Sequence, residues 1–202
     1  MGRRSDHTRG ELRALFVEHG HAHLGEVGLA RFSGREVAKR AGYSVGTIAN
    51  LFGSVDGLIA AINSRSFERW AELLDEQLSQ ARDDRIAALV AGYFAFAEQH
   101  PELWSAIYAH RLPEGIELPE DDRDRRAGLT RIVEEEVRTA LPADTQADVV
   151  RLSRSLVAVV HGHCSFVVSG SFALLEEPDP KAAALARVRE SLGAHGYRAE
   201  GQ

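Results

Sequence analysis

Residues 44–50 combine small and hydrogen-bonding side chains at the start of a predicted short helix. The stretch reads Ser-Val-Gly-Thr-Ile-Ala-Asn, so hydroxyl and amide groups stand beside residues with little or no side chain. Hydroxyl and amide groups can exchange hydrogen bonds with base edges in the major groove of DNA, and small neighbours let the backbone approach the duplex. These residues therefore indicate recognition of DNA.

The histidines could suggest a metal site, but their spacing argues against one. His19, His21 and His23 follow each other at intervals of two residues, as do His161 and His163. Residues two positions apart on a helix point in different directions. Neither group is therefore expected to hold a metal ion.

The remaining side chains give no support for enzyme chemistry. The sequence has no Ser-His-Asp arrangement, phosphate-binding loop or metal motif, so it predicts no catalytic residue, no cofactor and no enzyme activity. Cys164 is the single cysteine, which excludes an intrachain disulfide and a cysteine zinc cluster. A free cysteine is usually a small buried hydrophobe, and redox sensing is the alternative.

A further set of residues could line a binding pocket. Aromatic rings and a few polar groups recur in the predicted helices of the second half of the chain, and this composition suits an apolar or aromatic ligand held by one or two hydrogen bonds. The candidate ligand-binding residues are Tyr93, Phe96, Trp104, Tyr108, His161 and Phe166. Ordinary core packing is the alternative for each of them.

The elements that must position these residues are all helices. Apolar residues recur with a period of 3.6 nearly throughout, while alternating strand-like runs are absent. The spacing of Thr8 with Glu11 and of Ser33 with Glu36 predicts two capping boxes, and Ser44 is expected to cap a third helix. The all-α prediction comprises nine helices, at about 8–24, 33–40, 44–52, 54–80, 84–99, 101–111, 121–140, 145–171 and 180–194.

The second and third predicted helices form a pair with its own small core. Val37, Ala38 and Ile48 are expected to pack together across a turn at Gly42. Residues 1–52 carry eight Lys or Arg against five Asp or Glu, whereas the whole chain has a net charge of -6. A basic end on an acidic body is compatible with DNA binding, because phosphate contacts need only a local positive face.

Residues 33–61 resemble the signature of the TetR (tetracycline repressor) family of transcription regulators. They read Ser-Gly-Arg-Glu-Val-Ala-Lys-Arg-Ala-Gly-Tyr-Ser-Val-Gly-Thr-Ile-Ala-Asn-Leu-Phe, followed by Gly-Ser-Val-Asp-Gly-Leu-Ile-Ala-Ala. The resemblance implies a helix-turn-helix DNA-binding domain over 1–53 and a ligand-binding and dimerisation domain over 54–202. It places operator contacts at Ser33, Arg35, Tyr43, Ser44, Val45, Gly46, Thr47 and Asn50.

The resemblance also implies partners and a location. We expect a homodimer that binds a double-stranded, palindromic DNA operator, and a small apolar or aromatic effector that releases the protein as a repressor. The N-terminus has no apolar stretch of the secretory kind, so a cytoplasmic protein is expected.

Three positions depart from the family pattern. Ala49 replaces a usual aromatic residue, Leu51 a usual His or Tyr, and Val55 a common Lys. Phosphate contacts supply much of the affinity for DNA and little of the sequence preference. Operator binding could therefore be weak or could use Arg3, Arg4 and Arg9 as a basic arm. The alternative function is a dimeric helical protein that binds a small molecule or lipid and has weakened or lost DNA binding.

Residues 156–175 contain no Asp, Glu, Lys or Arg. A run of this length could span a bilayer, but two His, three Ser and two Gly interrupt it, so a buried helix is expected and no membrane partner. Small residues at steps of three or four allow close helix packing, against either a partner subunit, which we favour, or a core helix. This stripe consists of Ser155, Ala158, Gly162, Ser165 and Ser169.

Overall fold

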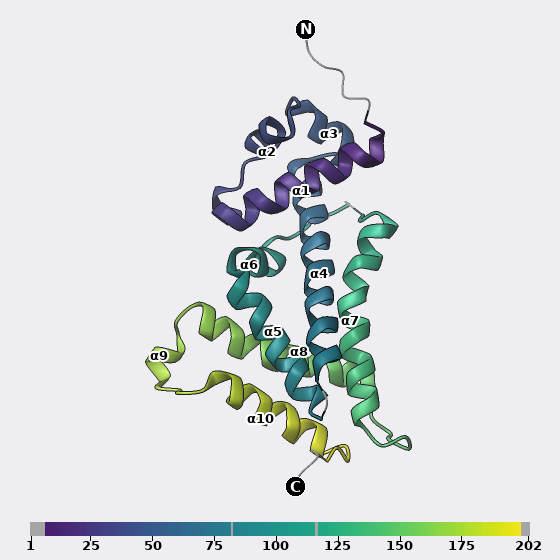
Figure 1. Ribbon diagram of the computed structural model, residues 1–202, viewed down its shortest axis with the longest axis vertical. Helices are drawn as coiled ribbons and strands as arrows, with labels where there is room; N and C mark the ends of the chain where they lie inside the picture. Colours follow the sequence, from purple (N-terminus) through teal and green to yellow (C-terminus); the bar gives the residue numbers. More distant parts are fainter. Residues whose placement is uncertain (1–6, 82, 116, 199–202) are drawn as a thin grey trace. The chain divides into compact units, whose positions relative to one another are not determined.

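The computed structural model describes residues 7–81, 83–115 and 117–198. In these ranges the chain forms ten α-helices and one 3-10 turn and no strands (Figure 1), which confirms the all-α prediction. The elements are α1 (Arg9–Val27), η1 (Leu29–Arg31), α2 (Gly34–Ala41), α3 (Gly46–Phe52), α4 (Val55–Gln80), α5 (Arg85–Gln99), α6 (Pro101–Ala109), α7 (Glu120–Ala140), α8 (Val149–Val168), α9 (Phe172–Leu175) and α10 (Pro180–Gly193).

The chain packs as two compact units. The first unit comprises Met1–Glu68 and Glu102–Arg126, and the second comprises Arg69–Pro101 and Ala127–Gln202. α4 and α7 each contribute residues to both units, and α6 belongs almost entirely to the first. The predicted boundary near residue 53 divides the chain by function, whereas these two units divide it by packing. The predicted boundary therefore stays a prediction.

Of the three helix caps predicted in the first unit, one forms completely, one forms in part and one does not form. Thr8 and Glu11 form the predicted capping box, since each side chain accepts a backbone N–H of the other residue. The Ser33 hydroxyl accepts from the Glu36 backbone N–H at 3.4 Å, but the Ser33 N–H donates to His23 Nε2 and not to Glu36, so the second predicted capping box is incomplete. Ser44 does not cap α3, which begins at Gly46 without a side-chain cap.

The core of the first unit joins α1, α2, α3, α4 and α6. It contains the predicted helix-pair residues Val37, Ala38 and Ile48, each at most 2% exposed. α1 and α4 approach closely at Gly20, where a Cβ atom would lie 2.5 Å from Ile62. The full buried cluster consists of Phe16, Leu24, Val37, Ala38, Ile48, Leu58, Ile62, Leu103 and Ala106.

In the second unit α5, α8 and α10 pack against one another (Figure 1). α8 begins at Val149, later than predicted, because the Asp148 carboxylate caps it by accepting from the Arg151 backbone N–H at 3.1 Å. It ends at Val168, and Gly170 then takes a left-handed conformation with φ 72°. The short helix α9 follows and accounts for the tenth helix.

The membrane-spanning reading of residues 156–175 does not match the structure. Among the described residues, no helix is long and apolar enough to cross a bilayer. One side of α8 packs into the second unit and the other carries the small residues.

Candidate DNA-binding surface and ligand cavity

The turn between α2 and α3 fixes the second helix of the pair against the first. Gly42 ends α2 in a left-handed conformation with φ 78°, which glycine adopts without steric cost. The Tyr43 backbone N–H donates to the Ala38 carbonyl at 2.9 Å. Ile48 then anchors α3 in the core with 2% exposure. α3 is thereby held with one face inward and the other toward solvent.

The outward face of α3 carries most of the predicted DNA contacts. Ser44, Gly46 and Asn50 are exposed, Val45 is 50% exposed, and Thr47 is partly exposed. Ser44 and Thr47 hydroxyl oxygens lie 3.5 Å apart. This face therefore presents two hydroxyls and one amide beside Gly46, which has no side chain. Such a face suits a helix that enters the major groove and hydrogen-bonds to base edges.

The other predicted contacts lie on α2 and in the turn. Arg35 is exposed in the first turn of α2, and Ser33 is partly buried because its hydroxyl caps that helix. The Tyr43 ring packs against Phe16 with centroids 6.1 Å apart, and its hydroxyl is buried without a hydrogen-bond partner among the described residues. Tyr43 therefore supports the packing of the turn, and its contact with DNA stays a prediction.

Two arginine side chains near this surface form hydrogen bonds within the protein. Arg9 donates to the Asn50 carbonyl at 2.9 Å and so ties the start of α1 to α3. Arg40 binds both carboxylate oxygens of Glu26, at 2.8 and 3.0 Å, and this side-chain hydrogen bonding raises the pKa of Arg40. Of the proposed basic arm, Arg3 and Arg4 lie outside the described residues.

His23 has a structural part that the sequence did not reveal. Its Nε2 accepts the Ser33 backbone N–H at 3.3 Å, and the residue is 5% exposed. The ring lies 5.6 Å from that of Phe32. His23 therefore positions the residue that caps α2. Among the described residues, no group of three or more possible ligands could hold a metal ion.

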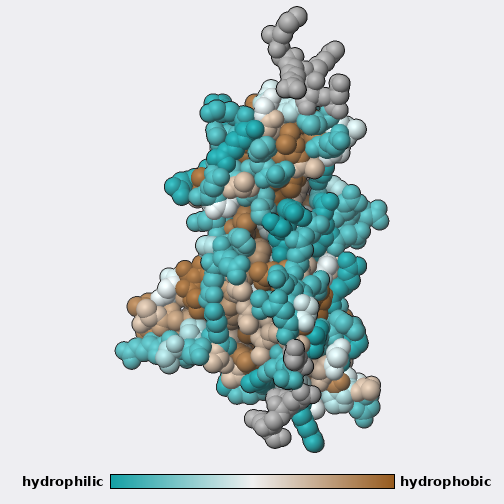
Figure 2. Space-filling model, viewed as in Figure 1, coloured by the Kyte–Doolittle hydropathy of each residue, from teal (hydrophilic) through white to brown (hydrophobic). Residues whose placement is uncertain are grey.

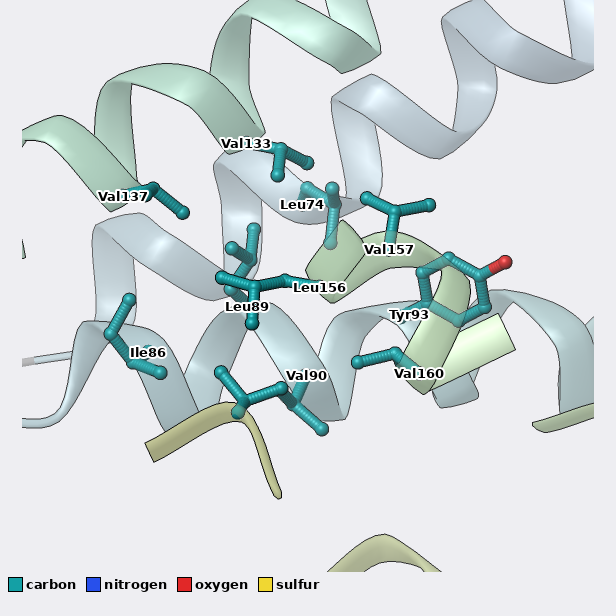
Figure 3. A pocket seen from close by; sticks show the side chains of 11 residues that line it. Leu74, Ile86, Leu89, Val90, Tyr93, Val133, Val137, Leu156, Val157 and Val160 are labelled. Carbon is teal, nitrogen blue, oxygen red and sulfur yellow. The ribbon is translucent and has the colours of Figure 1, made fainter. Parts of the chain in front are cut away.

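An aliphatic cavity lies inside the second unit (Figure 3). Its volume is about 40 Å³, which is room for a water molecule or two and far below that of a drug-sized ligand. Side chains from α4, α5, α7, α8 and α10 surround it. They are Leu74, Ile86, Leu89, Val90, Tyr93, Val133, Val137, Leu156, Val157, Val160 and Val188.

Two of the six predicted ligand-binding residues meet beside this cavity. The Tyr93 hydroxyl lies 3.0 Å from Nδ1 of His161, and desolvation by burial lowers the pKa of His161. Phe96 belongs to the same unit, is 1% exposed and stacks on Trp70 with ring centroids 4.8 Å apart. Tyr93 therefore lines the cavity, whereas His161 contacts Tyr93 and is not among the lining residues, and a ligand contact of either residue stays a prediction.

The other three predicted residues lie elsewhere. Trp104 and Tyr108 belong to the first unit, where their rings are 5.4 Å apart. Phe166 is 44% exposed on α8 and packs edge-on against Phe172. Aromatic composition missed the aliphatic lining because Leu and Val residues of a cavity look the same in sequence as those of any core.

A second surface lies on the side of α8 that faces away from the core. Leu156, Val160 and Cys164 are buried on one side of the helix, whereas Ala158 and Gly162 on the other are exposed. Nothing in the described chain would lie within 4 Å of a Cβ atom at Gly162. Of the small-residue stripe, Ser155 and Ser169 are also exposed and Ser165 is partly exposed. The stripe therefore does not pack against a core helix of the same chain.

Comparison with known proteins identifies this architecture. A family model described as the tetracyclin repressor-like C-terminal domain matches residues 86–190, just over half of the chain. The helix-turn-helix pair and the all-helical fold are those of a transcription regulator of the TetR type. The chain belongs to the TetR family, as its resemblance over residues 33–61 implies. Among curated proteins, none matches it in sequence.

Solved structures share the fold at low sequence identity. A protein of unknown function from Rhodococcus sp. RHA1 superposes with a TM-score of 0.71 and 19% identity, covering 96% of this chain and 99% of that one. A TetR transcriptional regulator from the same organism has a TM-score of 0.65 and 18% identity, covering 94% and 98%. The fatty acid degradation regulator FadR from Bacillus halodurans has a TM-score of 0.62 and 16% identity, covering 92% and 99%.

Proposed function

We propose that this protein is a ligand-responsive transcription regulator that binds a palindromic operator as a homodimer. The observation that carries the proposal is the exposed face of α3, where Ser44, Thr47 and Asn50 surround the open backbone at Gly46. TetR-family regulators bind DNA operators and form dimers. A helix anchored by Ile48 and polar on its outer face suits base readout in the major groove.

Dimerisation is supported by the small-residue stripe on α8. An exposed stripe of small residues lets a second helix approach closely, and Gly162 leaves the most room. Figure 2 shows hydrophobic side chains gathered over α9, where Leu174 is 86% and Leu175 61% exposed. A two-fold axis through this surface would pair two α3 helices, which suits an operator with two half-sites one DNA turn apart.

Ligand control is supported by the aliphatic cavity of the second unit. A cavity of about 40 Å³ must expand to hold an effector, so the empty and filled proteins would differ in conformation. An effector that binds only the expanded form shifts the population toward it. If the two recognition helices of the expanded form do not fit the operator, effector binding lowers the affinity for DNA. The coupling free energy is the same in both directions, so DNA binding lowers the affinity for the effector equally. The protein then acts as a repressor.

The alternative is a dimeric helical protein that binds a small molecule or lipid and has weak DNA binding. Two observations favour it: Val55, at the start of α4, offers an apolar side chain where a cation is common, and Arg40 is engaged by Glu26. The Bacillus halodurans structure is named for fatty acid degradation, which agrees with an apolar effector in either reading.

A mobility-shift experiment separates the two functions. The purified dimer is titrated onto labelled DNA from upstream of its own gene, with random DNA of equal length and base composition as the control. A regulator should bind the upstream DNA about a thousandfold more tightly than random DNA, near the lower end for specific binders. Equal affinity for both at each salt concentration would favour the alternative.

A further inference from the structure

The C-terminal end of α3 is held by a side chain from α1. The Arg9 guanidinium donates to the backbone carbonyl of Asn50 at 2.9 Å. This carbonyl belongs to the last turn of α3, where carbonyl groups have no partner within the helix. A cation at that end also interacts favourably with the helix dipole. Arg9 therefore caps the C-terminal end of the helix that carries the predicted base contacts.

A second arginine, one turn further along α1, contacts the same end of α3. Residues four apart lie on one face of a helix, so Arg13 and Arg9 project from the same face of α1. The Arg13 guanidinium carbon lies 4.7 Å from the ring centre of Phe52, the last residue of α3. Phe52 also packs against the fully buried Phe16, with ring centroids 6.4 Å apart. The position of Phe52 therefore depends on where the Arg13 guanidinium lies.

The Arg13 guanidinium is held in turn by a carboxylate from α7. It forms an ion pair with Asp122, whose side chain is 1% exposed. A guanidinium can stack on a ring and bind a carboxylate at the same time, because its N–H groups lie in its own plane. A carboxylate that has lost its hydration needs its cationic partners. Asp122 therefore contacts α3 indirectly, through one side chain.

Asp122 also has a partner that leads away from α3. Arg125 donates to Asp122 at 3.1 Å, and its other ion pair among the described residues is with Glu68 of α4, at 3.7 Å. Both arginines should stabilise the buried carboxylate. Of the two, Arg13 contacts α3, whereas Arg125 pairs with α4. This difference can separate an effect on the position of α3 from an effect on stability.

We propose that Asp122 is a positioning residue for DNA recognition, which holds the C-terminal end of α3 in place through Arg13 and Phe52. A recognition surface that is already ordered loses less conformational freedom when it binds. Without the carboxylate, the end of α3 is held less firmly. Preference for operator is then lost, because base edges are read by hydrogen bonds of defined geometry from Thr47 and Asn50. The part of this inference that concerns DNA rests on the proposed function.

The test compares two substitutions in the same turn of α7. Asp122→Asn removes the buried charge and Asp121→Asn an exposed one, so both change the net charge of the protein equally. Fluorescence anisotropy measures the affinity for DNA from upstream of the gene and for random DNA of equal length. Asp122→Asn should lower the preference for upstream DNA by about fivefold or more, the low end for coupling between two sites. Asp121→Asn should change it by less than about twofold.

Arginine substitutions show which partner of Asp122 transmits the effect. Arg13→Gln should lower the preference as much as Asp122→Asn, and the double variant should lose no more than either single one, because both break the same link. Arg125→Gln should leave the preference within about twofold of the wild type, although thermal unfolding should show that it also destabilises the protein. Equal losses of preference from Arg13→Gln and Arg125→Gln would overturn the proposal.

Hydrogen exchange in the DNA-free protein gives a readout that does not depend on DNA binding. Asp122→Asn should speed the exchange of amides in residues 46–53 by about fivefold or more. The amides of residues 34–41, in α2, should keep their wild-type rates. A variant that only unfolds more often would speed exchange in both segments by the same factor, and that result or unchanged exchange in residues 46–53 would overturn the proposal.

The two readouts keep two failures apart. A wild-type protein that does not distinguish upstream from random DNA would refute the regulator, and hydrogen exchange would then decide alone whether Asp122 positions α3. A wild-type preference for upstream DNA that Asp122→Asn and Asp121→Asn change equally would refute this inference and leave the regulator intact.

Discussion

Arg13 of α1 forms an ion pair with the Asp122 carboxylate in the first turn of α7. The Asp122 side chain is 1% exposed, and it also accepts from Arg125 at 3.1 Å. The Arg13 guanidinium lies 4.7 Å from the centre of the Phe52 ring. A buried carboxylate needs such partners because it has lost its hydration. The pair therefore joins two helices of the first unit that are more than a hundred residues apart in sequence.

Removing Arg13 should destabilise the protein because it leaves Asp122 with fewer partners. We expect Arg13→Ala to lower the free energy of unfolding by about 3 kcal/mol, at the low end for a broken buried pair since Arg125 remains. Arg138→Ala is the control, because Arg138 and Glu135 form an exposed pair that should contribute about 0.5 kcal/mol or less. Urea unfolding monitored by circular dichroism measures both. Equal losses would show that the Asp122 pair is no stronger than a surface pair.

The sequence predicts the helices well because their signals are local. Periodic apolar residues and the Thr8–Glu11 capping box act within one or two turns, so they can be read without the fold. The Arg13–Asp122 pair joins residues far apart in sequence, and no local pattern encodes it. The cavity is similar: of its lining residues only Tyr93 was predicted, from its chemistry, because the Leu, Ile and Val lining depends on how five helices meet.

Cys164 should be an inert thiol. Burial, with a smaller contribution from Glu98, raises its pKa from 9.0 to about 12, and the reactive species is the thiolate. At pH 8 the thiolate fraction falls by roughly a thousandfold, so alkylation by iodoacetamide should be at least that much slower in the native protein than in urea. Mass spectrometry over a time course measures both rates. A native rate within tenfold of the unfolded rate would revive the redox-sensor reading.

Gly162→Trp should convert the proposed dimer into a monomer. The side chain has room within one chain, so the fold should survive, but it would occupy the space of a partner helix. Gly128→Trp on α7 is a matched control, since a Cβ atom there also meets nothing within 4 Å. Sedimentation velocity at micromolar concentration should show dimers of the wild type and of the control only. A monomeric wild type would remove the dimer from the proposed function.

Thr47→Ala and Asn50→Ala should weaken operator binding with little effect on folding. Both side chains lie at the outer face of α3, and each lost base contact should cost about 1 to 3 kcal/mol per half-site. Thr130→Ala, an exposed threonine on α7, is the control. Competition binding with operator and random DNA measures the preference, and thermal unfolding checks the fold. If the preference for operator is unchanged, the reading face of α3 has been misassigned.

Val55→Lys should strengthen DNA binding without changing its specificity. Val55 is the first residue of α4, is 41% exposed, and lies 3.1 Å from where a Cβ atom of Gly34 would stand. A lysine there would keep the apolar contact through its methylene groups and extend its ammonium group into solvent. One added phosphate contact per subunit should steepen the slope of log affinity against log salt by roughly 1.8 per dimer, at about 0.9 per contact.

Ala49→Tyr tests in the same experiment whether an uncharged contact raises the affinity for DNA without changing its salt dependence. Ala49 is exposed on α3, and a tyrosine there would add a neutral hydrogen bond and an apolar contact to the DNA backbone. Affinity should rise while the salt slope stays the same, because no counterion is released by an uncharged group. Salt titrations of both variants and the wild type, on operator and random DNA, give the comparison. If Val55→Lys leaves the slope unmoved, the start of α4 does not approach phosphate, and the docking geometry expected for a TetR-family protein does not hold for this chain.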